Sequence, residues 1–201
     1  MYQKIIIIKI GTSVSLTNRG ALDEYRLGHL AAQIGKLHKH SMGVVLVASG
    51  AIACGRRINN NFDRTCAAGV GQAILTATFT EVFRHHGLNI AQILVKAEDL
   101  VSSLAQTVYD LLAMGIVPLF NENDVINTQS DFASGNDFLA VELARCIGSQ
   151  KLVILSTMQR SKFGVGGGEA KLRAVEMARQ AGVETQIVNG KVRNILLKSL
   201  S

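Results

Sequence analysis

The sequence predicts an α/β fold, a three-layer αβα sandwich around a mainly parallel central sheet, in one domain over residues 1–201. Two observations lead to this prediction. Short aliphatic runs alternate with longer segments of helical periodicity, which is the pattern of right-handed βαβ units. The first run, KIIIIKI at 4–10, is almost unbroken, as is typical of a strand buried on both faces.

The first half of the chain supplies three expected strands and three expected helices. Apolar residues near helical spacing predict a helix over 22–40, and GVVLVA at 43–48 predicts a second buried strand. A glycine-flanked turn leads into a helix at 49–57. A longer helix is expected over 67–87, ended by Gly87, before a third strand at 89–95.

The second half repeats the alternation. We expect helices at 102–115, 137–149, 169–182 and 191–200, and strands at 116–120, 151–156 and 183–188. The stretch 121–137 is polar and has no single period, so a loop or a hairpin is expected there.

Composition limits the class of protein. With 48% hydrophobic and 18% charged residues the chain can bury a sizeable core, which argues against disorder. Three cysteines without CxxC spacing indicate reduced thiols and a cytoplasmic location. The first apolar run is too short for a membrane span, so no membrane partner is expected. The net charge of +6 fits a mildly basic protein or a site for anionic substrates, and scattered basic residues argue against nucleic acid.

Small and polar residues follow the expected strands, at the edge where parallel sheets bind ligands. Lys9 lies inside the first strand, two residues before Gly11. It is either an edge-strand lysine that reaches water or a cation aimed at phosphate, and Gly11 favours phosphate because a missing Cβ lets backbone N–H groups approach an oxyanion. Ser49-Gly50 after the second strand is either an ordinary helix cap or an anion site.

Further polar groups follow the later strands. Asp124, Asn136 and Asp137 in the 121–137 stretch can bind an ammonium group or hold lysines by charge, or simply form a solvated loop. Ser156-Thr157 follow the fifth strand. Gly166, Gly167 and Gly168 precede a helix carrying Lys171, which favours phosphate binding, although such glycines often form only a flexible loop. No three-ligand metal pattern is expected.

Together these segments resemble the amino acid kinase family, most closely its glutamate 5-kinase branch. The resemblance rests on KIGTS (9–13), VASGAIACG (47–55), GVGQ (69–72), PLFNENDV (118–125), NDFLA (136–140) and GGGEAK (166–171). It covers nearly the whole chain. It implies transfer of the ATP γ-phosphoryl group to the glutamate side-chain carboxylate, the first step of proline biosynthesis, with Mg²⁺ accompanying ATP.

The resemblance also assigns roles to residues. It implies that Lys9 and Lys171 flank the transferred phosphoryl group and that Asp137 orients them, while Ser49, Asp124 and Asn136 hold glutamate. It implies that ATP is bound by Gly11, Gly50, Ser156, Thr157, Gly166 and Gly167. Proline as feedback inhibitor and a homodimer or homotetramer are implied as well, and no RNA-binding-type C-terminal domain is expected.

The chain departs from the family pattern in several places. The family usually has GDND where this chain has Ser134 to Asp137, and TGGMxTK where it has Val165 to Lys171. Three segments are short, at 157–165, near 65–66 and near 101–102. Nine extended residues at 157–165 span at most roughly 30 Å, which reaches the glycine loop but cannot form an adenine pocket.

Two explanations of the short segments are open. The protein is truly shortened, and then weak or inactive, or mobile loop residues are left out of the sequence. We expect the second, because the deficits fall at substrate-covering loops, which are often mobile. The rival functions are a kinase of the same family acting on acetylglutamate, aspartate, UMP or an isoprenoid phosphate, and a non-catalytic regulatory relative with an incomplete nucleotide pocket.

Overall fold

The computed structural model describes residues 2, 4–126, 135–157 and 168–200. Within these ranges six strands form one parallel sheet in the order β3-β4-β2-β1-β5-β6. The strands are β1 (Lys4–Ile10), β2 (Met42–Ala48), β3 (Asn89–Val95), β4 (Ile116–Glu122), β5 (Lys151–Leu155) and β6 (Glu184–Val188). The predicted fold class is confirmed, and each predicted strand is present.

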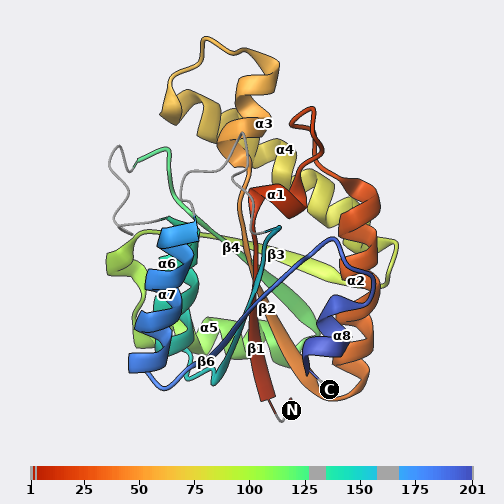
Figure 1. Ribbon diagram of the computed structural model, residues 1–201, viewed down its shortest axis with the longest axis vertical. Helices are drawn as coiled ribbons and strands as arrows, with labels where there is room; N and C mark the ends of the chain where they lie inside the picture. Colours follow the sequence, from red (N-terminus) through yellow and green to blue (C-terminus); the bar gives the residue numbers. More distant parts are fainter. Residues whose placement is uncertain (1, 3, 127–134, 158–167, 201) are drawn as a thin grey trace.

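Helices cover both faces of the sheet (Figure 1). One face packs against α2 (Glu24–Lys39), α4 (Arg64–Arg84) and α8 (Ile195–Leu200). The other packs against α5 (Ser102–Ala113), α6 (Asn136–Cys146) and α7 (Gly168–Gln180). Two separate hydrophobic cores result, which confirms the three layers. The remaining helices are α1 (Thr12–Ser15), α3 (Ala51–Ile58) and the 3₁₀ turn η1 (Ala97–Asp99).

Several element boundaries differ from the prediction, among them the start of α8 at Ile195 rather than 191, and two of the differences have clear local reasons. α4 begins at Arg64 rather than 67, because the Asp63 carboxylate caps it by accepting a hydrogen bond from the Cys66 N–H at 2.7 Å. β4 continues to Glu122, since Asn121 and Glu122 pair with the last two residues of β3. The polar stretch after β4 therefore begins as strand, and residues 127–134 of it lie outside the described ranges.

β1 lies in the middle of the sheet, with Lys9 aligned between Val47 of β2 and Ile154 of β5. The edge-strand interpretation of Lys9 is therefore wrong. Alternation along the strand turns Lys9 to the same side as Ile7, whose contacts belong to the core under α5, α6 and α7. The sequence of β1 thus aims one cation at the helices that carry Asp137 and Lys171.

The chain runs continuously through two of the three short connections. Between α3 and α4, the Phe62 N–H donates to the Asn59 carbonyl at 3.2 Å. After β3, the Lys96 N–H donates to the Asp99 carboxylate at 2.7 Å, and the Asp99 N–H donates to the Lys96 carbonyl. Both connections are closed turns, and the expectation that loop residues are left out stays a prediction. The third short segment lies almost entirely outside the described residues.

α4 is, in the described part of the chain, the one helix long and apolar enough to cross a membrane by length and composition. Its side chains Leu75, Phe79 and Phe83 are fully buried against the sheet. The apolar character of α4 is therefore that of a core helix.

α3 and α4 cross with their backbones in contact at two glycines. A Cβ added at Gly55 would lie 1.9 Å from the Ala67 carbonyl oxygen, and one added at Gly71 would lie 1.7 Å from the Ala51 carbonyl oxygen. No side chain fits at either position. The crossing fixes the start of α3, next to Ser49, against the part of α4 that carries Gln72.

Gly71→Ala is expected to destabilise the protein by about 3 kcal/mol, because the new methyl group forces the two helix backbones apart. Chemical denaturation with urea measures this change. Gly69→Ala is the matched control two residues away, where the new Cβ would meet only Val125 Cγ2 at 3.5 Å. The control should stabilise by about 0.5–1 kcal/mol through lower backbone entropy. Equal losses in both variants would contradict the close crossing.

Candidate active site

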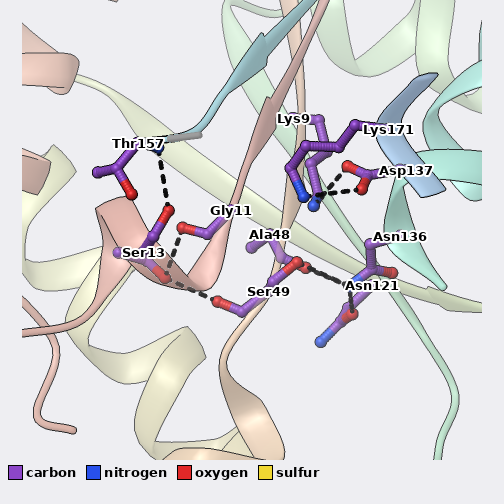
Figure 2. A network of polar contacts seen from close by, with 11 residues as sticks. Lys9, Gly11, Ser13, Ala48, Ser49, Asn121, Asn136, Asp137, Thr157 and Lys171 are labelled. Atoms are coloured by element: carbon purple, nitrogen blue, oxygen red, sulfur yellow. Dashed lines mark hydrogen bonds and ion pairs between the residues drawn. The ribbon is translucent and has the colours of Figure 1, made fainter. Parts of the chain in front are cut away.

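A buried ion cluster occupies the carboxyl end of β1 (Figure 2). Lys9 Nζ lies 2.6 Å from Asp137 Oδ1, and Lys171 Nζ lies 3.4 Å from Asp137 Oδ2. The Lys9 and Asp137 side chains are only 6% and 4% exposed, so water does little to screen their charges. Two lysines share one carboxylate, which leaves one positive charge over. A cluster of this kind attracts an anion.

Three elements bring these charges together. β1 carries Lys9, α6 carries Asp137 in its first turn, where a carboxylate is favoured by the helix dipole, and α7 carries Lys171. Burial lowers the pKa of the Lys9 ammonium, Asp137 partly opposes that shift, and Lys171 adds to it. Among the described residues Asp137 Oδ1 has no hydrogen bond of good geometry, although Lys9 Nζ is close. The contact is an ion pair without ideal alignment.

Gly11 lets the end of β1 approach β5 closely beside this cluster. A Cβ there would lie 3.0 Å from the Leu155 carbonyl oxygen and 3.9 Å from Lys9 Nζ. The Gly11 N–H donates to that same carbonyl at 3.0 Å, so this expected phosphate donor is already paired. The Ser156 N–H donates to the Val188 carbonyl at 3.0 Å, and the Thr157 N–H donates to Ser13 Oγ at 3.2 Å. These backbone groups hold β1, β5 and β6 together at the site.

A group of neutral polar side chains lies beside the ion cluster (Figure 2). Asn136 Nδ2 donates to the Ala48 carbonyl and to Asn121 Oδ1, both at 2.7 Å. Its contact to Ser49 Oγ is longer, at 3.3 Å. Both Nδ2 hydrogens are used by the shorter contacts, which leaves Ser49 Oγ open to another donor. Asn136 Oδ1 is buried and has no partner among the described residues.

Asp124 lies apart from these contacts and is already neutralised. Arg64 at the start of α4 donates to Asp124 Oδ1 at 2.5 Å. Burial raises the pKa of the Asp124 carboxyl, and Arg64 opposes that shift. The sequence predicted Asp124 as a substrate ligand but gave no role to Arg64. The position of Arg64 depends on the start of α4, which is set by the Asp63 cap and was not predicted from the sequence.

The remaining expected binding residues are Gly50, Gly166 and Gly167. Gly50 precedes α3 with φ of +125°, a conformation that requires glycine, and no side chain caps the helix. Ser49 is therefore not the cap. Gly166 and Gly167 lie outside the described residues. In the described ranges no three His, Cys, Asp or Glu side chains gather as a metal site would need.

Comparison with known sequences gives a family match. Residues 4–160 match the model of the amino acid kinase family. The chain is 30% identical to the glutamate 5-kinase of Clostridium acetobutylicum, over 95% of this chain and 90% of the relative. It is also 30% identical to the glutamate 5-kinase of Vibrio vulnificus, where it spans 98% of this chain but only 64% of the relative's length.

The alignment with the Clostridium enzyme is longer than this chain. It extends over 240 positions, whereas 95% of this chain is about 191 residues, so about 49 of the positions are gaps in this chain. The relative therefore carries residues inside the matched region that this chain lacks.

Comparison with solved structures shows the same fold. An isopentenyl phosphate kinase matches with a TM-score of 0.69 at 16% identity, covering 98% of this chain and 95% of that chain. A Giardia lamblia carbamate kinase bound to AMP-PNP matches with a TM-score of 0.66 at 14% identity, covering 97% and 96%.

Asp137→Asn is expected to cost about 3–5 kcal/mol of unfolding free energy at neutral pH, because it leaves two lysines near one another without their buried counter-charge. Urea denaturation measures the loss. Glu142→Gln on the same helix removes an exposed pair with Arg145 and should change stability by less than about 1 kcal/mol. A similar small effect at both positions would contradict a buried, charged Asp137.

The lowered pKa of Lys9 predicts a pH dependence of stability. The folded pKa lies below the unfolded value of 10.5, so between the two the unfolded chain holds a proton that the folded chain has lost. The free energy of unfolding, taken relative to Lys9→Met, should therefore rise with pH across that window. Urea titrations from neutral pH to 10.5 measure the difference. A difference that falls with pH would show that the pKa is raised.

Proposed function

Because this chain belongs to the amino acid kinase family, we propose that it transfers the γ-phosphoryl group of ATP to the side-chain carboxylate of L-glutamate, giving glutamyl 5-phosphate. This is the first step of proline biosynthesis. The observation that carries the proposal is the buried Lys9–Asp137–Lys171 cluster at the carboxyl end of the central strand. The identity to glutamate 5-kinases supports the choice of glutamate.

The chemistry asks little of the protein beyond position and charge. A glutamate carboxylate oxygen attacks the γ-phosphorus, the bond from that phosphorus to the β–γ bridging oxygen breaks, and ADP leaves with the electron pair. The carboxylate is already a nucleophile at neutral pH, so no general base is needed. Catalysis then rests on holding the reactants in line and neutralising charge on the phosphoryl oxygens.

In this proposal Lys9 and Lys171 supply that neutralisation, and Asp137 holds both ammonium groups in place. Burial keeps the charges strong, because the local dielectric is low. Mg²⁺ would accompany the ATP phosphates and offset their charge. The described residues offer no group of three metal ligands, so we assign it no protein cage. The family likeness to a carbamate kinase bound to AMP-PNP is consistent with ATP as phosphoryl donor.

The acceptor would bind beside the cluster, at Asn136 and Ser49. The unpartnered Asn136 Oδ1 is a buried acceptor, and leaving such a group without a donor costs about 1–3 kcal/mol. The α-ammonium group of glutamate carries the hydrogens that would satisfy it. An ionised phosphate acceptor has only lone pairs to offer. The orphan oxygen therefore favours an amino acid over an isoprenoid phosphate.

One observation favours a different acceptor. The Asp124 carboxylate, expected to bind an ammonium group, is paired with Arg64. A small-molecule acceptor with extra negative charge near Arg64 and no ammonium group would therefore fit the Arg64–Asp124 pair better than glutamate does. The gaps against the Clostridium relative instead favour a non-catalytic relative with an incomplete nucleotide pocket. Proline inhibition, a homo-oligomeric state and a cytoplasmic location remain part of the glutamate proposal.

Purified protein with Mg²⁺, ATP and L-glutamate is expected to release ADP and to form an acyl phosphate that hydroxylamine traps as a hydroxamate. Lys171→Met should lower kcat by about 100-fold or more, the usual loss when one transition-state charge contact is removed. Arg173→Met is the matched control, since Arg173 is an exposed residue on the same helix paired only with Glu169 among the described side chains.

The acceptor series for this assay is L-glutamate, N-acetylglutamate, L-aspartate, UMP, isopentenyl phosphate and carbamate. Turnover of another acceptor with none of glutamate would replace the proposed substrate. ADP release that Lys171→Met leaves unchanged would show that the ion cluster is not the catalytic centre. No turnover with any acceptor, together with no ATP binding by calorimetry, would favour the non-catalytic alternative.

A further inference from the structure

A chain of side-chain amides leads from Asn136 away from the ion cluster to the edge of the sheet. Asn121 Nδ2 donates to Gln72 Oε1 at 2.8 Å, and Gln72 Nε2 donates to Gln92 Oε1 at 2.8 Å. Gln92 lies on β3 and Gln72 on α4. Neither residue belongs to the site described above. We call Asn136, Asn121, Gln72 and Gln92 the amide relay.

Backbone groups fix the direction of the relay at its outer end. Gln92 Nε2 donates to the Leu119 carbonyl at 3.1 Å, and a carbonyl can only accept. Gln92 Oε1 must then face Gln72, where it accepts from Nε2. Gln72 Oε1 is thereby turned toward Asn121. Each amide in the relay has one orientation compatible with its neighbour.

Backbone groups also fix the inner end. Asn121 Oδ1 accepts from the Glu122 N–H at 3.0 Å, and a backbone N–H can only donate. Asn136 Nδ2 donates to the Ala48 carbonyl at 2.7 Å. Both ends therefore require the same direction. The one group left over is Asn136 Oδ1, which is buried and has no partner among the described residues.

We propose that Gln72 and Gln92 are positioning residues, which hold Asn136 through Asn121 so that its Oδ1 faces the acceptor substrate as a hydrogen-bond acceptor. This inference rests on the proposed function for the identity of the substrate, but not for the geometry. The relay matches a substrate that carries N–H or O–H donors within reach of Asn136 Oδ1. The relay should affect binding of the acceptor substrate and leave binding of ATP unchanged.

The relay has a specific weak point. Gln72→Met keeps the length of the side chain and removes both its donor and its acceptor. Asn121 Nδ2 then loses its acceptor, and the Asn121–Asn136 pair is left with its contacts to the Glu122 N–H and the Ala48 carbonyl. Gln72→Glu keeps an oxygen for Asn121 but replaces the Nε2 donor to Gln92 and Thr76 by a second acceptor, so its effect on Asn136 should be smaller than that of Gln72→Met.

Steady-state kinetics tests the inference in the full chain. Gln72→Met and Gln92→Met should raise KM for glutamate by about tenfold, with KM for ATP unchanged within about twofold. Gln72→Glu should raise it less than Gln72→Met does. The matched control is Gln33→Met, which removes a buried glutamine that bonds the His29 carbonyl and the Leu196 N–H, between α2 and α8. The control should lose stability and keep KM for glutamate.

An independent readout separates the relay from the proposed reaction. In NMR spectra of ¹⁵N-labelled protein, the Asn136 side-chain amide is the signal pair missing from Asn136→Asp. Its hydrogens should exchange with solvent about tenfold faster in Gln72→Met than in the unmodified protein or Gln33→Met. If glutamate is not a substrate but this pattern holds, the proposed function is wrong and the relay stands.

Three results would overturn the relay. The first is unchanged exchange of the Asn136 amide in Gln72→Met, whatever the kinetics show. The second is an equal rise of KM for glutamate in Gln33→Met, which would assign the effect to stability. The third is a rise of KM for ATP as large as that for glutamate, which would place the effect on the whole site.

Discussion

The ion pair between Lys9 and Asp137 is the contact on which the rest of the site depends. A lysine on the central strand of a parallel sheet is largely shielded from water, so it needs a counter-charge from the layer above. Asp137 supplies it from the first turn of α6, and the same carboxylate draws Lys171 in from α7. One carboxylate thus ties the sheet to two helices, and Asn136 adds further polar contacts between α6 and the sheet.

The two halves of the site are built from different chemistry. The half next to β1 and β5 uses charge, which acts over distance and tolerates imperfect alignment, as the Lys9–Asp137 contact shows. The half next to β2 and β4 uses neutral amides, whose hydrogen bonds are directional. This division fits a reaction in which one substrate is recognised mainly by phosphate charge and the other by the placement of individual hydrogens.

Sequence patterns predicted most of the fold because apolar runs such as KIIIIKI leave few alternatives to a buried strand. The grouping of Lys9, Asp137 and Lys171 came from the family resemblance, and in the structure Lys9 lies near the end of β1 while the other two lie in the first turns of α6 and α7. The sequence patterns missed Arg64, because its position depends on one capping carboxylate. The roles of Gln72 and Gln92 were missed as well. A glutamine inside the apolar strand NIAQILV was the available signal, yet its partners lie on elements far apart in the chain.

The crossing of α3 and α4 through Gly55 and Gly71 has a consequence for how the acceptor side can move. Because the two backbones touch, neither helix can rotate or slide alone without collision. Gly50 and Ser49 lead into α3, and Gln72 follows Gly71 directly on α4. Any opening of this side for substrate entry or product release must therefore move both helices together as one rigid body, joined where Gly55 and Gly71 lack side chains.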